Sequence, residues 1–272
     1  MTLLIGCDPE LFVKTKEGKF ISGWGMVEGD KKRPLKVEKG AVQVDGMALE
    51  FNIDPAASFE EFVESVEAVK KQLSEMIGAD KFELTADPSV FFDEDVWSMT
   101  PDEAKILGCE PDFNAWENGG ANPRPDNSTT MRSGGGHVHV GWTDDADLTD
   151  FDHQAACMQA TKQLDAALGL QSLLWDNNND RRKLYGKAGA YRIKPYGMEY
   201  RVLSNAWVRN SALIGHVYKV TRKAMEDLMN GNPYYEFIGD KIRSVIDSNN
   251  TKEAAYLSNL LNKRFNVPVY EG

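Results

Sequence analysis

The first third of the chain alternates apolar and polar positions, which is typical of β-strands with one buried face. This pattern predicts strands over residues 2–13 and 20–24, and a strand region over 82–92 that breaks at Asp87-Pro88. Asp8-Pro9-Glu10 interrupts the first of them. Because proline donates no hydrogen bond to a ladder, we expect a sheet edge or a bulge at this point.

Residues 40–53 predict either two strands or one bulged strand, because Gly46 breaks the register. Gln43 and Asp45 share a face before the break, and Glu50 lies on the polar face after it. Both halves of this segment therefore carry polar side chains on one side of the expected sheet.

Helical spacing begins after these strands. Ser58 and Glu61 form a capping box, and apolar residues then repeat at helical intervals until Gly78 ends the helix. The second half of the chain predicts four more helices, at 149–168 with a continuation to Trp175 left open, at 205–229, at 235–246, and at 252–265 capped by Thr251.

Three segments between these elements are expected to differ in kind. Residues 93–135 predict a long loop with a short helix after Thr100-Pro101, and so long a loop in a compact protein is usually functional or disordered. Residues 177–183 predict a polar loop. Residues 191–203 predict one strand with Gly197 near its centre.

The order of these elements predicts the fold class. Strands come first, then a helix, more strands and mostly helices, without the regular βα alternation of a parallel sheet. This order favours an α+β protein built on an antiparallel sheet. A length of 272 residues allows one large domain or two small ones, and we expect a single domain over 1–272.

The most distinctive stretch runs from Gly134 to Gly141. In it His137 and His139 alternate with two valines, so that in a strand both imidazoles point to the same side. The three glycines before the strand let the backbone bend sharply or approach a bound group closely. A single His-x-His is more often structural than functional, so its role depends on which side chains the neighbouring strands place beside it.

Composition limits the function classes. The formal net charge of -11 argues against a groove for nucleic acid, which needs a basic face, although residues 181–201 are locally basic. Cys7, Cys109 and Cys157 are too few and too scattered for a disulfide framework or a cysteine zinc site, so we expect reduced thiols. The N-terminus has no signal-peptide pattern, and no apolar run approaches the ~20 residues needed to cross a bilayer.

Ionisable residues occupy polar positions of several predicted strands. They are Asp8 and Glu10, Asp45 and Glu50, His137 and His139, and Glu199 and Arg201. Carboxylates gathered on one concave face repel one another and lose hydration, and a cation relieves both effects. Carboxylate oxygens with an imidazole suit Mg²⁺ or Mn²⁺ better than zinc. The alternative is that each acid lies on a solvated outer face.

Basic residues are concentrated just before the last of these strands. They are Arg181, Arg182, Lys183, Lys187, Arg192 and Lys194. Guanidinium groups fit phosphate oxygens well, although the same charges could simply balance an acidic protein. The sequence has no Gly-x-x-x-x-Gly-Lys-Ser/Thr loop, so a nucleotide would not be held in P-loop fashion.

Five short motifs occur in a fixed order. They are Gly-Cys-Asp-Pro-Glu, Gln-Val-Asp-Gly, Glu-Phe-Asn, Gly-Gly-His-Val-His-Val-Gly and Tyr-Gly-Met-Glu-Tyr-Arg. Together they resemble the glutamine synthetase-like carboxylate–amine ligases, and more closely the phage-type COOH–NH2 ligases (type 2) of that superfamily. The resemblance runs from residue 6 to about 205. The histidine and Glu-Tyr-Arg motifs are also similar to glutamate–cysteine ligases of the bacterial and plant type.

The resemblance implies a curved antiparallel sheet that forms a funnel, with helices outside and metal and ATP inside. It implies one metal on the carboxylate-substrate side and a second on the ATP phosphates. The first would be held by Glu10 and Glu50 with Asp45, and the second by Asp8, His137 and Glu199. Asp8 departs from the pattern, since glutamine synthetase has the longer glutamate there.

The resemblance also implies roles at the reacting groups. Arg201 would contact the transferred phosphate or acyl phosphate, and Glu10 and Glu50 would take part in catalysis. The residues expected to bind the nucleotide are Arg192, Lys194, Lys187 and His139. Asp112 is a candidate for the base that deprotonates the amine, and the alternative is that it is a turn residue.

The resulting hypothesis is an ATP-dependent ligase that uses Mg²⁺ (or Mn²⁺) and forms an amide through an acyl phosphate. Two other functions stay open, a metal-dependent hydrolase that activates water without ATP and a non-catalytic binding or virion protein that keeps the fold. Expected partners are small-molecule or peptide carboxylate and amine substrates, with no membrane. Nucleic acid is disfavoured but open, and so is a homo-oligomer. We expect a cytoplasmic location, in the host if the chain is phage-encoded.

Overall fold

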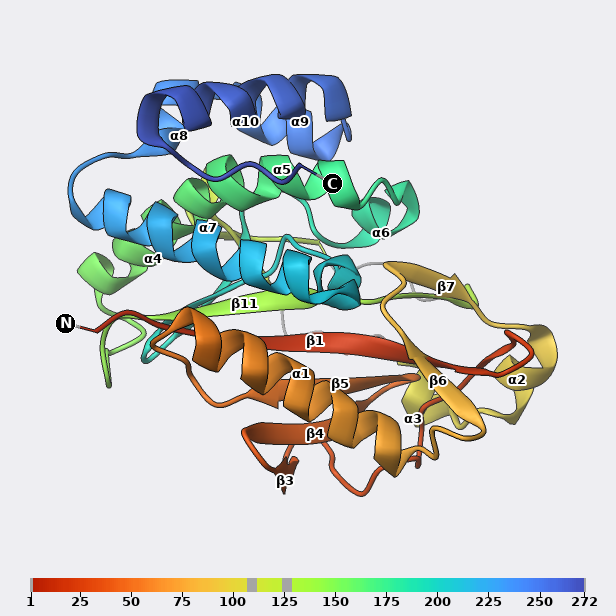
Figure 1. Ribbon diagram of the computed structural model, residues 1–272. Helices are drawn as coiled ribbons and strands as arrows, with labels where there is room; N and C mark the ends of the chain where they lie inside the picture. The colour runs from red at the N-terminus through yellow and green to blue at the C-terminus, as the bar shows by residue number, and fades with distance from the viewer. Residues whose placement is uncertain (1, 107–111, 124–128, 272) are drawn as a thin grey trace.

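The computed structural model describes residues 2–106, 112–123 and 129–271. Within them, eleven strands form one sheet and two short strands form another. Helices pack beside the large sheet and extend away from it in a further layer (Figure 1). The structure therefore confirms the α+β class and the large antiparallel sheet, which does not close on itself.

The large sheet has the order β3-β4-β5-β1-β11-β13-β12-β8-β9, and β2 and β6 also pair with β1. Its strands are β1 (Leu4–Thr15), β2 (Phe20–Ile21), β3 (Leu35–Val37), β4 (Gly40–Asp45), β5 (Ala48–Ile53), β6 (Phe82–Thr85), β8 (Phe113–Asn114), β9 (Gly120–Ala121), β11 (Gly136–Gly141), β12 (Ala190–Lys194) and β13 (Gly197–Tyr200). The small sheet pairs β7 (Ser89–Phe91) with β10 (Met131–Ser133).

The α-helices of the described residues are α1 (Phe59–Met76), α2 (Glu94–Met99), α3 (Asp102–Lys105), α4 (Phe151–Leu164), α5 (Leu170–Trp175), α6 (Asn179–Leu184), α7 (Ser211–Met229), α8 (Tyr234–Ile238), α9 (Lys241–Asp247) and α10 (Thr251–Phe265). In Figure 1, α1 and α7 lie beside the strands, and α8 to α10 lie beyond them at the top. No helix in the described part of the chain combines the length and apolar composition needed for a membrane span.

Alternation along the central strands separates the core from the polar face. Val138 and Val140 of β11, and Met198 and Tyr200 of β13, are fully buried in the core cluster, in which helices α4 and α7 also take part. Since successive side chains of a strand point to opposite faces, the polar residues between them lie together on the other face. This face carries the candidate site.

Strand β1 runs through Pro9 without a break, so the expected interruption and sheet edge are wrong. It pairs with β11 from Leu4 to Pro9, and at Glu10 it begins to pair with β5. Pro9, which has no N–H to donate, thus falls where β1 changes partners. Because of this change, Asp8 lies opposite His137 of β11, whereas Glu10 lies opposite Glu50 of β5.

Residues 40–53 form two strands, β4 and β5, joined by a turn in which Gly46 has φ of 58°. Gln43 lies opposite Glu50 in this pair. Of the two interpretations left open by the pattern, the pair of strands is therefore correct. The turn places Asp45 at the end of β4, beside the face that carries Glu50.

The expected single strand over 191–203 is wrong, because β12 and β13 form a hairpin with a two-residue connection. Arg192 lies opposite Glu199, and Lys194 lies opposite Gly197. Gly197 has φ of 150°, and a Cβ there would lie 2.1 Å from the Val140 carbonyl oxygen, so only glycine fits. The hairpin brings two basic residues onto the face of Glu199.

Two expectations in the second half of the chain are wrong because of local capping. Helix α6 replaces the loop expected over 177–183, since the Asn178 side chain accepts from the Arg181 N–H at 3.1 Å. The helix expected over 205–229 begins as a 3-10 turn, and α7 itself starts only at Ser211.

Other helix expectations differ at their ends. The helix expected over 235–246 is divided into α8 and α9, because Gly239 has φ of 76° and ends the first. Helix α10 is capped by the Asn250 side chain instead of by Thr251. The capping of α1 by Ser58 is confirmed, with its hydroxyl accepting from the following turn at 3.2 Å.

The long loop expected over 93–135 contains more structure than predicted. In its described parts it holds α2, α3, β8, β9 and β10, so only the short helix after Thr100-Pro101 was foreseen. Cys7 and Cys157 are buried free thiols, as the sequence predicts, and Cys109 lies outside the described residues.

Asp165 is a fully buried acid in the long helix that follows β11. The helix expected over 149–168, with its continuation to Trp175 left open, does continue to Trp175, and it contains a π turn at Asp165–Gly169. Asp165 accepts hydrogen bonds from the Trp116 indole at 2.6 Å, the Gly189 N–H at 2.7 Å and the Tyr200 hydroxyl at 2.7 Å. Burial raises the pKa of Asp165 to about 7, although these donors oppose the rise.

We expect Asp165→Asn to lower the free energy of unfolding by about 1–3 kcal/mol, because its amide N–H groups would face other donors. An acid whose pKa rises on folding stabilises the protein at low pH, and this stability is lost as pH rises through the folded pKa. The wild type should therefore lose stability between pH 3.8 and about 7, and the variant should lack this component. Denaturant unfolding across this range measures both effects. The exposed Asp145→Asn is the control, and an unchanged pH profile in Asp165→Asn would contradict the prediction.

Candidate active site

Cross-strand register places the polar residues of four strands on one face. Asp8 of β1 lies opposite His137 of β11. His139 lies opposite Glu199 of β13, which in turn lies opposite Arg192 of β12. Facing residues in antiparallel strands have Cβ atoms about 4.5–5.5 Å apart, so these side chains are direct neighbours.

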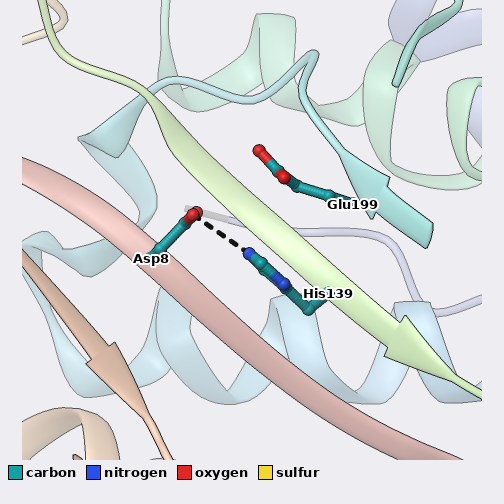
Figure 2. A group of neighbouring side chains, drawn as sticks. All are labelled: Asp8, His139 and Glu199. Atoms are coloured by element: carbon teal, nitrogen blue, oxygen red, sulfur yellow. Dashed lines mark ion pairs between the residues drawn. The ribbon is translucent and has the colours of Figure 1, made fainter. Parts of the chain in front are cut away.

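Asp8 connects the two imidazoles, and Figure 2 shows its pair with His139, with Glu199 nearby. Its Oδ1 lies 3.1 Å from His137 Nδ1, and its Oδ2 lies 3.1 Å from His139 Nε2. Glu199 is almost fully buried, with its Oε1 3.5 Å from His137 Nδ1. We term these four residues the histidine group. One ligand atom each from Asp8, His139 and Glu199 lie within 4.8 Å of one another.

The carboxylates of the histidine group carry charge at neutral pH. Burial alone would raise the pKa of Asp8, but His139 and His137 outweigh it and hold the pKa well below its usual value. Burial and Asp8 likewise raise the pKa of Glu199, yet the charges of Arg201 and the imidazoles lower it to about 2. Both acids are therefore ready to accept a cation or a hydrogen bond.

Three further carboxylates meet beside the histidine group. Glu10 lies opposite Glu50 in the β1–β5 ladder, and ligand atoms of Glu10, Asp45 and Glu50 lie within 4.8 Å of one another. The Gly135 N–H donates to Glu10 Oε2 at 2.8 Å, and Gln43 Nε2 donates to Glu50 Oε1 at 3.0 Å. We term Glu10, Asp45 and Glu50 the carboxylate group.

Repulsion within the carboxylate group shows in its pKa values. Burial, and then the charge of Asp45, raise the pKa of Glu10. Burial, followed by the charges of Asp8 and Asp45, raises the pKa of Glu50 well above its usual value. Lys31 lies against the group, with its Nζ 2.8 Å from Asp45 Oδ1. Burial and repulsion thus favour the protonated forms of Glu10 and Glu50, and Lys31 offsets part of the repulsion.

Positive side chains surround Glu199. Lys194 Nζ lies 2.9 Å from Glu199 Oε2, Arg192 Nη1 lies 3.8 Å from Oε1, and Arg201 Nη1 also pairs with Oε1. Asp112 Oδ1 lies 2.6 Å from Arg201 Nε and 3.6 Å from Arg192 Nη2. These pairs fix the guanidinium of Arg201 between two carboxylates.

Not every expected residue reaches the site. Lys187 is exposed, and its charge lowers the pKa of Asp247. Arg181 does border the site, since it lines a cavity together with Glu10 and Arg201, but its guanidinium donates to the carbonyls of Val202 at 3.0 Å and Leu203 at 2.9 Å. Of the basic residues between Arg181 and Lys194, the two on β12, Arg192 and Lys194, therefore lie beside Glu199.

Two cavities open onto the groups. One, of about 70 Å³, is lined by Glu10, Asp45, His137, Arg201 and Asp112, among others. A larger one, of about 400 Å³, is lined by Asp8, Glu50, His139, Tyr196 and Asn52, among others. A volume of about 400 Å³ suits a small molecule, and both cavities are lined by members of both groups.

The donor sets fit divalent cations. Two ligand atoms on one ion can be up to roughly 5 Å apart at the bond lengths of 2.3–2.6 Å that Ca²⁺ takes, and somewhat less on smaller ions. Glu10, Asp45 and Glu50 meet the spacing for Ca²⁺, and so do Asp8, His139 and Glu199 of the histidine group. His139 Nε2 lies 3.1 Å from Asp8 Oδ2, while its Nδ1 contacts the Tyr196 hydroxyl, so the imidazole is held beside the carboxylates. Carboxylate oxygens with one imidazole suit Mg²⁺ or Mn²⁺.

The sequence missed three residues of this site. Lys31 and Tyr196 come from connections between strands, and Arg132, which lines the smaller cavity, comes from the small sheet. Lys31 and Arg132 lie in no periodic pattern and in none of the quoted motifs, whereas Tyr196 begins the motif Tyr-Gly-Met-Glu-Tyr-Arg but was given no role. Only the Pro195-Tyr196-Gly197 sequence carried a usable signal, since proline followed by glycine marks a turn.

Comparison with known protein families adds an independent observation. Residues 128–232 match the family described as phage phiEco32-like COOH.NH2 ligase-type 2. The matched part includes His137, His139, Glu199 and Arg201, whereas β1, β4 and β5 lie before it. The match confirms the resemblance to this family that the motifs indicated, and it supports a carboxylate–amine ligase enzyme.

Comparison with solved structures finds a protein described as "GmaS/ADP complex-Conformation 1". The likeness has a TM-score of 0.46 and 11% sequence identity, and it covers 99% of this chain and 71% of that chain. No curated protein matches the chain.

Proposed function

We propose that this chain is an ATP-dependent carboxylate–amine ligase that forms an amide through an acyl phosphate. The observation that carries the proposal is the meeting of the carboxylate group, the histidine group and Arg201 on one sheet face between two cavities. The family match over residues 128–232 supports the reaction class.

The two groups are the places where the chain would hold divalent ions. Glu10, Asp45 and Glu50 would hold one, and the histidine group would hold the other through Asp8, Glu199 and an imidazole. When bound, such ions neutralise charge on the triphosphate during phosphoryl transfer. His137 was expected at the metal and His139 at the nucleotide, and the structure brings both imidazoles to Asp8.

Arg201 supplies positive charge from the protein side. Its side chain is only 11% exposed and is held by Glu199 and Asp112, so little rearrangement is needed before it contacts a phosphoryl group. Asp112, the expected base, engages Arg201 and Arg192, and we assign it the role of holding Arg201 in place. Arg192 and Lys194 would bind the remaining phosphates.

The chemistry explains why ATP is required. A carboxylate is a poor electrophile, because its oxygen is a poor leaving group. Transfer of the γ-phosphoryl to that oxygen gives ADP and an acyl phosphate. An amine then attacks the acyl carbon, the C–N bond forms, the C–O bond breaks, phosphate leaves and a carboxylate removes the amine proton.

Hydroxylamine tests this proposal without knowledge of the natural amine. The protein is incubated with ATP, Mg²⁺, hydroxylamine and a panel of amino acids and peptides with side-chain carboxylates. We expect ADP and a hydroxamate in equal amounts, with neither formed when ATP or Mg²⁺ is omitted. Metal-dependent hydrolysis of an amide without ADP would indicate the hydrolase instead. Failure to bind ATP and Mg²⁺ in calorimetry would indicate a non-catalytic protein.

A further inference from the structure

Lys31 is a protein cation placed against the carboxylate group. Its Nζ lies 2.8 Å from Asp45 Oδ1, and Asp45 has only 15% of its side chain exposed. The ammonium also attracts Glu50 and Glu10. It therefore acts on all three acids that would hold a divalent ion.

The turn that carries Lys31 is firmly built. Asp30 Oδ1 accepts from the N–H groups of Lys32 at 2.8 Å and Arg33 at 2.9 Å. The Gly29 carbonyl accepts from Val44 N–H of β4 at 2.9 Å. The turn is thus hydrogen-bonded to the strand that carries Asp45. A Cβ on Gly29 would lie 2.2 Å from the Val42 carbonyl oxygen, so only glycine allows this approach.

Neighbouring cations on the same turn do not share this position. Lys32 and Arg33 are exposed, and Arg33 pairs at 4.0 Å with Asp30 instead of with the site. Half of the Lys31 side chain also remains exposed, which leaves it room to swing away from Asp45. Of the cations on this turn, Lys31 is therefore the one placed against Asp45, and its exposed side chain has room to move away.

We propose that Lys31 is the resident counter-cation of the carboxylate group, which a divalent ion must displace from Asp45, so that Lys31 lowers the metal affinity of this site. The inference rests on the proposed function, because it takes the carboxylate group as a metal site. The ammonium of Lys31 and a divalent ion bound by the carboxylate group would repel each other over a few ångströms. Removing the ammonium therefore strengthens the attraction of the three acids for a metal ion.

Mn²⁺ binding to the protein without ATP or substrate tests the inference. Free Mn²⁺ is counted by electron paramagnetic resonance for the wild type, Lys31→Met, Lys31→Arg and Lys32→Met. We expect Lys31→Met to bind Mn²⁺ roughly three- to tenfold more tightly, and Lys31→Arg to match the wild type. Lys32→Met removes the same charge from the same turn and should change little. The gain should disappear when Lys31→Met is combined with Glu50→Gln.

Thermal unfolding provides a second measurement on the same proteins. Without metal, Lys31→Met should unfold at a lower temperature than Lys32→Met, because the acids lose their counter-cation. Mn²⁺ should then stabilise Lys31→Met more than it stabilises the wild type.

The outcomes separate the two ideas. If the wild type binds Mn²⁺ and Lys31→Met binds it no more tightly than Lys32→Met, the role of Lys31 is refuted while the proposed function stands. If neither the wild type nor Lys31→Met binds Mn²⁺, the proposed metal site itself is refuted. Binding by Lys31→Met alone would support the displacement of Lys31 directly.

Discussion

Glu199→Gln is expected to reduce ATP-dependent turnover by roughly 10²- to 10³-fold while the protein stays folded. Glu199 has 2% of its side chain exposed and contacts Lys194, Arg192 and Arg201. Glutamine keeps the shape but removes the charge that collects these cations, and it offers one ligand oxygen fewer for a metal. Arg201 keeps its pair with Asp112, so the core should tolerate the change.

Release of ADP with a carboxylate from the hydroxylamine panel measures this loss, and the melting temperature reports folding. Glu117→Gln is the matched control, because Glu117 is a partner of Arg243 on the exposed surface. Its turnover should equal that of the wild type. Wild-type turnover in a folded Glu199→Gln protein would remove this residue from the mechanism.

Glu50→Gln is expected to have opposite effects on stability and function. Burial and the charges of Asp8 and Asp45 raise the pKa of Glu50 well above its usual value, so its ionised form destabilises the folded, metal-free chain. Removing this charge should raise the melting temperature by roughly 2–4 °C, the shift that about 1 kcal/mol produces in a chain of this size. The amide oxygen can still accept from Gln43. Turnover should fall by at least about 10²-fold, because a metal ligand is lost.

The size of the increase in melting temperature depends on pH. An acid whose pKa is raised on folding costs no stability below its unfolded value of 4.5, and the cost grows as pH rises toward the folded value. Glu50→Gln should therefore melt higher than the wild type at pH 8 with EDTA, and nearly equally at pH 4. The exposed Glu28→Gln should show no difference at either pH. A lower melting temperature for Glu50→Gln at pH 8 would contradict the repulsion within the carboxylate group.

Local patterns were sufficient to predict the parts of the site that lie on strands. A period of two puts Asp8 with Glu10, and His137 with His139, on the same face whatever the neighbouring strands are. The five motifs then indicated which strands meet, and the structure places their acids in two groups. The capping of α1 by Ser58 was equally local and was also predicted.

Features that depend on turns and long-range packing could not be predicted in this way. Pro195 and Gly197 mark the hairpin between β12 and β13, yet the apolar alternation on both sides hid it. Lys187 lies near Arg192 in the sequence, but it is exposed and its charge acts on Asp247. Lys31 reaches Asp45 only because its turn is hydrogen-bonded to β4, and no periodicity encodes that contact.

Diffraction from crystals grown with Mn²⁺ and a non-hydrolysable ATP analogue tests the central claim most directly, because manganese has an anomalous signal. The account predicts one peak bound by Glu10, Asp45 and Glu50, and a second bound by Asp8, Glu199 and an imidazole, with the analogue's phosphates beside Arg201. Bound analogue with no manganese at either group would contradict it.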